Sequence, residues 1–114
     1  TPVPNAREGV IGVVQVRGRV LPVIDVRVRV GLAAAEPTPD TRLVVVRLGE
    51  RVVALRVDRA RELVRLEPEQ VEPPPDLVAA GSGGLVCGVT RIRGRTLLVI
   101  DLGKLIGEER VHGE

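Results

Sequence analysis

A ten-residue phrase occurs twice in this chain, and its recurrence constrains the fold more than any other feature. Residues 16–25 read VRGRVLPVID, and residues 92–101 read IRGRTLLVID. When residues 10–31 are aligned with residues 86–107 at a constant offset of 76 positions, about half of the positions are identical and no gap is needed. Repetition at this density indicates two copies of one structural unit, so we predict two similar lobes.

Each copy has the pattern of a β-hairpin. Apolar, mostly β-branched residues lie on both sides of an Arg-Gly pair, over 10–26 in the first copy and 85–102 in the second. Glycine supplies the positive φ of a tight turn, so Gly18 and Gly94 are assigned to the two turns. Pro22 lies inside the second strand of its hairpin and cannot donate to a ladder, which predicts a sheet edge or a bulge there.

The stretch between the copies contains a further hairpin over 42–58, which turns at Gly49-Glu50. Residues 63–66 fit a short helix or an extended strand equally well, and the three prolines at 73–75 end that segment. The glycine-rich residues 76–84 are predicted to be an irregular connection. Asp101 is expected to cap a last helical turn, and its counterpart Asp25 is expected to cap or fix a turn.

The two copies differ in what precedes them. The second follows the 42–58 hairpin and a proline-rich crossover, whereas the first follows only TPVPN. If the lobes are alike, the first lobe lacks its opening hairpin. We therefore expect an incomplete first lobe over 1–32, a second lobe over 33–107 and a polar tail over 108–114. Since a two-stranded ribbon is unstable alone, a strand-exchanged homodimer is one expected consequence.

Composition excludes several classes of function. The chain has no Phe, Trp, Tyr or Met, so its core must come from Val, Leu, Ile and Ala, and no aromatic ring can stack on a base. The 17 basic and 15 acidic side chains are interspersed, which indicates a soluble surface rather than a nucleic-acid binder. No apolar stretch approaches the ~20 residues that cross a bilayer, so direct membrane insertion is not expected.

The single cysteine and the single histidine suggest no reactive centre. Cys87 cannot form an internal disulfide and is expected to be a buried small hydrophobe, while His112 is expected to be solvated in the polar tail. Together they cannot supply the four ligands of a zinc site, so neither a metal nor a cofactor is predicted.

One enzymatic hypothesis remains to be weighed. Asp25 and Asp101 occupy equivalent positions in the two copies, as the paired aspartates of a two-lobed aspartic protease do. Such proteases carry a hydroxyl residue and then glycine after the aspartate, but this chain reads Asp25-Val26-Arg27 and Asp101-Leu102-Gly103. The residues therefore favour capping over catalysis, and no catalytic residue is predicted.

Three segments in order resemble the CheW family of chemotaxis coupling proteins. They are VPN followed by GVVQVRGRVLPVIDVR over 12–27, then RLVVVRLGERVVALRVDRARELV over 42–64, then EPPP followed by GVTRIRGRTLLVIDLGKLI. The similarity spans nearly all of residues 2–107. Gln15-Val16 departs from the family's usual Asn-Leu, and the family's strands that precede the VPN stretch have no counterpart in this sequence.

The resemblance implies an all-β fold of two small SH3-like barrels and a non-enzymatic adaptor. CheW-like proteins couple methyl-accepting chemoreceptors to the histidine kinase CheA, docking on the receptor's cytoplasmic tip and on the kinase's regulatory domain. That function would place the chain in the cytoplasm at membrane-bound receptor arrays. The alternative hypothesis is a CheW-like regulatory domain excised from a CheA-type kinase or from a receiver-linked coupling protein.

The resemblance also implies candidate partner-binding residues. Gly12 and Arg17 match positions associated with receptor coupling, and Gly18 completes the Arg-Gly turn. A guanidinium donates several hydrogen bonds in a fixed fork, which suits an interface carboxylate. Val57, Asp58 and Glu62 fall in the VDRARELV segment. For Arg17 a solvated side chain, and for Val57, Asp58 and Glu62 a structural role, remain the alternatives.

Overall fold

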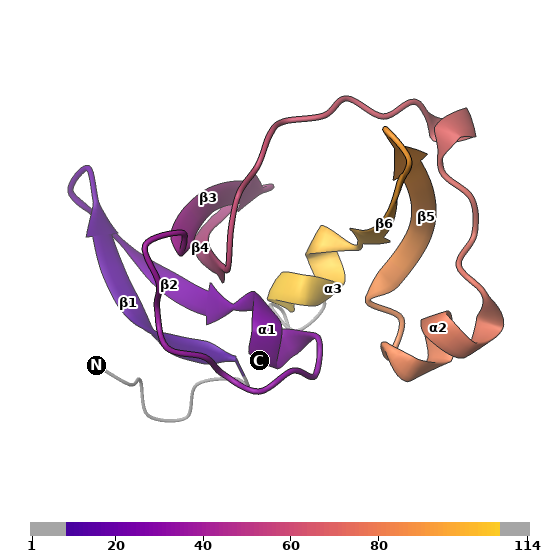
Figure 1. The fold of residues 1–114 in the computed structure, drawn as a ribbon. Helices are drawn as coiled ribbons and strands as arrows, with labels where there is room; N and C mark the ends of the chain where they lie inside the picture. The colour runs from indigo at the N-terminus through magenta and orange to yellow at the C-terminus, as the bar shows by residue number, and fades with distance from the viewer. Residues whose placement is uncertain (1–8, 108–114) are drawn as a thin grey trace. The chain divides into compact units, whose positions relative to one another are not determined.

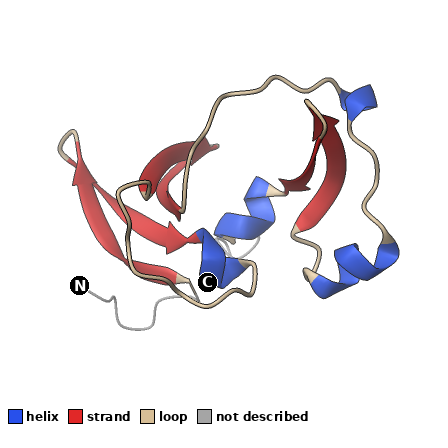
Figure 2. Cartoon of the chain, viewed as in Figure 1, coloured by secondary structure: helices blue, strands red, loops and turns tan. Residues whose placement is uncertain are grey.

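The computed structural model describes residues 9–107, and the chain divides into two units, Thr1–Arg61 and Glu62–Glu114. Strands dominate the first unit, the second combines a two-stranded sheet with helical segments, and all the helices are short (Figure 2). The prediction of an all-β chain with two small lobes is therefore confirmed. The expected tail over 108–114 lies outside the described residues.

The first unit is a four-stranded sheet with strand order β1-β2-β4-β3 (Figure 1). β1 and β2 pair antiparallel around Arg17-Gly18, and β3 and β4 pair antiparallel around Gly49-Glu50. The two hairpins join through a parallel pairing of β2 with β4. Its elements are β1 (Val10–Val16), β2 (Arg19–Asp25), α1 (Val26–Arg29), β3 (Arg42–Leu48) and β4 (Arg51–Val57).

The second unit contains a two-stranded antiparallel sheet, β5 (Val86–Ile92) with β6 (Arg95–Ile100). A short 3-10 turn (Pro68–Gln70) and helix α2 (Asp76–Gly81) precede the sheet, and helix α3 (Leu102–Ile106) follows it. The crossover chain touches β5 once, because the backbones of Glu72 and Val89 exchange two hydrogen bonds of 2.8 Å.

The hairpin 42–58 pairs with the first copy of the repeat, whereas the sequence suggests that it belongs with the second copy. β4 pairs with β2 through Val23–Ala54, Ile24–Leu55 and Asp25–Arg56. The first copy therefore has a companion hairpin, whereas β5–β6 pairs with no other hairpin within residues 9–107. The chain divides between residues 61 and 62 and not at the expected boundary between residues 32 and 33. The physical reason is a long-range strand pairing, which no local sequence pattern encodes.

The core of the first unit lies along the junction between β2 and β4. Burial there is two-sided, because consecutive residues of β2 and of β4 are buried and their side chains point to opposite faces of the sheet. The fully buried aliphatic residues of this junction are Leu21, Val23, Ile24, Val53, Ala54 and Leu55. In the second unit Leu85, Val86, Leu105 and Ile106 are the buried aliphatic residues.

The structure differs from expectation in three further places. Residues 63–66 adopt neither a helix nor a strand. Residues 76–81, expected to be irregular, form α2, which begins directly after Pro75. Cys87 is exposed rather than buried, because side chains alternate along β5 and its neighbours Val86 and Gly88 take the buried side.

Candidate functional site

The two Arg-Gly turns have the same backbone. Arg17 and Gly18 have φ of 51° and 81°, and Arg93 and Gly94 have φ of 53° and 77°. Positive φ at both central residues of a two-residue loop is the signature of a type I′ turn, whose twist suits the flanking strands. Asn-Gly is the usual sequence for this turn, so an arginine at the first position of both copies is unfavourable for the backbone.

The side chains of these two arginines are used differently. Arg93 forms an ion pair with Glu62 within the second unit. Arg17 is exposed, and among the residues that the structure describes it has no hydrogen-bond or ion-pair partner. A guanidinium held at a rigid turn with all its donors free is suited to a carboxylate on another protein.

Exposed apolar residues accompany Arg17 on the β1–β2 hairpin. Only Val23, Ile24 and Asp25 of β2 pair with β4, so the half of the hairpin nearer the turn extends from the sheet as a two-stranded arm (Figure 1). Val13 lies opposite Pro22, and Gln15 lies opposite Val20, so these side chains share one face. Val13 and Val20 are 51% and 66% exposed. We call Val13, Gln15, Arg17 and Val20 the arm surface.

Gly12 lies at the base of this arm. It is buried, has a φ of 154°, and sits at a register shift between β1 and β2, opposite Val23. Its counterpart Gly88 sits at the same shift in β5, where an added Cβ would collide with the side chain of Val71 and lie 3.4 Å from the carbonyl oxygen of Glu72. Gly88 therefore lets the crossover chain approach β5 closely.

Val57 and Asp58 lie at the far end of the same sheet. Asp58 accepts a 2.8 Å hydrogen bond from Nη1 of Arg27, and Nε of Arg27 donates to the carbonyl of Ala33 at 2.8 Å. β2 separates Arg27 from the Arg17 turn by its full length, about 20 Å for a strand of this size. The structure therefore does not bring Asp58 and Arg17 together, and it gives Asp58 an internal partner.

The candidate residues thus fall into three places. Gly12, Arg17 and Gly18 lie on the arm, Val57 and Asp58 lie at the end of β4, and Glu62 lies in the second unit on Arg93. The exposed pair Val13 and Val20 was not predicted from the sequence, since β-branched residues in a strand indicate burial as readily as exposure. Arg27 was not predicted either, because its partner lies 31 positions away.

The equivalent aspartates both cap helices. Asp25, 2% exposed, accepts a 3.0 Å hydrogen bond at Oδ1 from the backbone N–H of Arg27, and Oδ1 of Asp101 accepts a 3.2 Å bond from that of Lys104. Their own N–H groups donate to the carbonyls of Gly9 and Leu85, each at 2.8 Å. The two carboxylates belong to different units, and each accepts a backbone N–H bond from the helix that follows it. Neither unit therefore contains a pair of catalytic carboxylates formed by these two residues.

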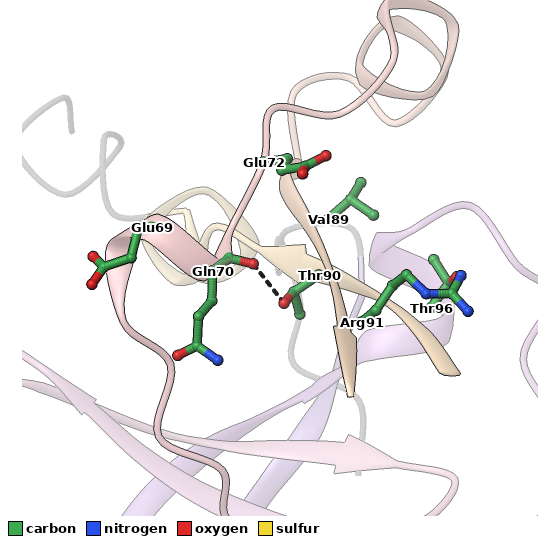
Figure 3. A pocket seen from close by; sticks show the side chains of 7 residues that line it. All are labelled: Glu69, Gln70, Glu72, Val89, Thr90, Arg91 and Thr96. Atoms are coloured by element: carbon green, nitrogen blue, oxygen red, sulfur yellow. Dashed lines mark hydrogen bonds between the residues drawn. The ribbon is translucent and has the colours of Figure 1, made fainter. Parts of the chain in front are cut away.

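A pocket of about 500 Å³ opens in the second unit between the crossover chain and β5–β6 (Figure 3). Its polar groups largely satisfy one another. The hydroxyl of Thr90 donates to the carbonyl of Gln70 at 2.7 Å, and the guanidinium of Arg91 donates to Oγ1 of Thr96 at 3.0 Å. The lining residues are Glu69, Gln70, Glu72, Val89, Thr90, Arg91 and Thr96.

Within residues 9–107 no group of three or more His, Cys, Asp or Glu side chains could hold a metal ion. His112, the one histidine, falls outside that range. Among the described residues, no helix is both long enough and apolar enough to span a bilayer.

Comparison with known proteins finds one family. The family model for the CheW-like domain matches residues 1–110. The chain is 34% identical to the chemotaxis protein CheW of Rhizobium meliloti strain 1021 over 109 residues, covering 96% of this chain and 70% of that protein. It is 28% identical to the chemotaxis protein CheW of Bacillus subtilis strain 168, again over 96% of this chain and 70% of that protein.

A solved structure agrees with these relatives. The crystal structure of the scaffolding protein TtCheW from Thermoanaerobacter tengcongensis superposes with a TM-score of 0.80 at 27% sequence identity. The match covers all of this chain and 75% of that one.

Proposed function

Since this chain belongs to the CheW-like domain family and is a chemotaxis coupling adaptor, we propose that it joins the cytoplasmic tip of a methyl-accepting chemoreceptor to the regulatory domain of a CheA-type histidine kinase. It does so by presenting shaped surfaces, without a reacting group. Such an adaptor works on the cytoplasmic side of the membrane, within receptor arrays. The relatives reported are chemotaxis proteins CheW and a scaffolding protein, which supports an adaptor over an excised kinase domain.

The observation that carries the proposal is the arm surface. It combines exposed apolar side chains with a guanidinium that has no partner among the described residues. Arginine is enriched at protein-binding hot spots, where neighbouring apolar contacts exclude water. We assign Arg17 to a carboxylate of the receptor or of the kinase, and Val13 and Val20 to the apolar part of the same contact.

The other candidate residues have supporting roles in this proposal. Gly12 sets the base of the arm, and Gly18 makes its turn. Asp58, through Arg27, ties α1 and the chain after it to the end of β4. Val57 ends β4 opposite Arg42, and Glu62 holds the second turn through Arg93. These five residues are proposed to act on partner binding through the shape of the molecule.

A pull-down with purified kinase regulatory domain and with a receptor cytoplasmic fragment tests the proposal. Arg17→Asn removes the guanidinium but leaves a residue that accepts the turn, so the arm should persist. We expect at least one of the two affinities to fall roughly tenfold, the size of one lost charge-assisted hydrogen bond.

The matched control is Arg93→Asn at the equivalent turn. It removes the ion pair to Glu62 but leaves the arm surface intact, so the affinity for either partner should fall by much less than in Arg17→Asn. Binding of neither partner by the unmodified chain, or equal loss in the two variants, would contradict the proposal.

A further inference from the structure

The end of the β1–β2 arm carries two positive charges that no described residue neutralises. Between Val10 and Ile24 the sequence contains no Asp or Glu, so Arg17 and Arg19 are the only charged residues of that stretch. Both are exposed, and neither guanidinium has a hydrogen-bond or ion-pair partner within residues 9–107. Only Gly18 separates them, so their Cα atoms are at most about 7 Å apart and the two like charges repel one another.

None of the acidic side chains described in the first unit pairs with this turn. Asp40 forms an ion pair with Arg59, and Asp58 forms one with Arg27. Asp25 is buried and accepts a hydrogen bond from the backbone N–H of Arg27. The described chain thus supplies no carboxylate for the two arginines of the arm, whose donors stay available to a partner.

The equivalent turn of the second copy is arranged differently. Arg93 forms an ion pair with Glu62, and the guanidinium of Arg91 donates to Oγ1 of Thr96 at 3.0 Å. Only Arg95 lacks a hydrogen-bond or ion-pair partner among the described residues. Two of the three guanidiniums at this turn are therefore engaged within the second unit, whereas both guanidiniums at the first turn are available.

The position of Arg19 determines how a partner can contact the arm. Arg19 lies opposite Val16, in the pair that closes the turn, and Val20 lies opposite Gln15 (Figure 1). Since side chains alternate along a strand, Arg19 and Val20 lie on opposite faces of the arm. Arg17 lies at the turn, where these two faces meet. A partner that contacts Arg17, Arg19 and Val20 together must enclose the end of the arm.

We propose that Arg19 contacts the partner together with Arg17, and that the partner presents a notch with two carboxylates, one for each guanidinium. The inference rests on the proposed function and specifies the chemistry of the surface that the arm meets. A guanidinium donates in a fixed fork that matches a carboxylate, and complementary charge gives an encounter its specificity and its rate. A nucleic acid fits less well, because the exposed neighbour Val20 is apolar and the chain has no aromatic ring to stack on a base.

Isothermal titration calorimetry tests the inference, with the full chain titrated against the kinase regulatory domain and against the receptor cytoplasmic fragment. Arg19→Gln removes the charge at an exposed position and leaves the backbone ladder intact, so the circular dichroism spectrum should not change. The dissociation constant for at least one partner should rise roughly threefold to tenfold. Arg19→Glu should raise it further, because the acidic notch repels the new carboxylate.

The salt dependence of binding separates a charge contact from a structural role. The dissociation constant of the unmodified chain should rise between about 0.05 M and about 0.5 M sodium chloride, since salt screens exposed charges. The rise should be shallower for Arg19→Gln, which has lost one of the two charges. Arg19→Lys keeps the charge without the fork, so its salt dependence should match that of the unmodified chain.

The matched control is Arg95→Gln, at the equivalent position of the second copy, where the arginine is also exposed and has no partner among the described residues. Its dissociation constants should change less than about twofold. Unchanged binding of both partners by Arg19→Gln, or an equal loss in Arg95→Gln, overturns this inference and leaves the proposed function standing. Binding of neither partner by the unmodified chain overturns both.

Discussion

The turn arginines illustrate a local conflict between backbone and side chain. A residue with a Cβ at φ near 50° is unfavourable relative to glycine or asparagine, yet arginine occupies this position in both copies. In the second copy the ion pair with Glu62 offsets part of that cost. In the first copy no described residue pairs with Arg17, so nothing offsets the backbone cost of this arginine. Local strain of this kind is typical of positions that serve binding.

This conflict gives a prediction at the residue scale. Arg17→Asn should leave the free energy of unfolding unchanged or raise it by about 0.5–1 kcal/mol, because asparagine tolerates the left-handed region that arginine adopts unfavourably. Urea denaturation monitored by circular dichroism measures the change. A clear loss of stability in Arg17→Asn would show that the guanidinium is held within the chain and is not reserved for a partner.

The capping aspartates give a second prediction. Asp25→Ala removes the acceptor for the backbone N–H of Arg27 at a site where water cannot replace it, and should destabilise the chain by about 1–2 kcal/mol. Asp101→Ala removes a longer bond at a half-exposed site and should cost less. The same denaturation series compares them, and equal losses at the two positions would contradict the role of burial.

At the scale of elements, the close approach of the crossover chain to β5 depends on one missing side chain. A Cβ at Gly88 would collide with Val71, and the neighbouring carbonyl of Glu72 belongs to the two hydrogen bonds that hold the crossover on β5. The collision is with Cγ1 of Val71, a short β-branched side chain next to Glu72, so relieving it would shift the crossover chain and strain those hydrogen bonds. The second unit relies on these bonds, because its sheet has only two strands.

Gly88→Ala should therefore destabilise the chain by about 1–3 kcal/mol, the usual cost of overpacking. Gly81→Ala is the matched control. Gly81 lies in α2 without a positive φ and with open space where a Cβ would stand, so alanine should stabilise by about 0.5–1 kcal/mol. Thermal unfolding of both variants measures the difference, and destabilisation by both would mean that glycine content, not the contact, is responsible.

At the scale of the whole molecule, the two units are joined by a long segment without regular structure. Residues 59–67 form neither helix nor strand and are mostly exposed. Arg59 is held by an ion pair with Asp40 at 2.6 Å, whereas Arg61 and Arg65 are exposed and have no hydrogen-bond or ion-pair partner among the described residues. Such a segment is accessible to proteases, while paired strands are not.

Brief digestion with trypsin should therefore cut first after Arg61 and Arg65 and release a fragment that ends near the boundary of the first unit. Mass spectrometry of the early products identifies the sites. Because the first unit has a four-stranded sheet with its own core, its fragment should persist, while the second fragment is digested further. Initial cleavage within β3 or β4 would contradict the observed division of the chain.

Local chemistry made much of this fold predictable from the sequence. The repeat identified two hairpins, glycine and arginine located their turns, and the aspartates located the caps of α1 and α3, because each feature depends on residues close in sequence. The family resemblance likewise rests on contiguous motifs. The arm surface was only partly predictable: Arg17 stood out at the turn, but nothing in the sequence distinguishes the exposed Val13 and Val20 from the buried Val23.

Tertiary structure alone decided which hairpin accompanies which copy. The segments around Asp25 and Asp101 are nearly identical, so the sequence offers β4 two equivalent edges, and β4 takes the one on β2. That choice buries Leu21 and Ile24 and leaves Leu97 and Leu98 exposed. Parallel pairing between distant strands depends on chain connectivity and on the packing of both edges together, and neither is written in any local pattern of residues.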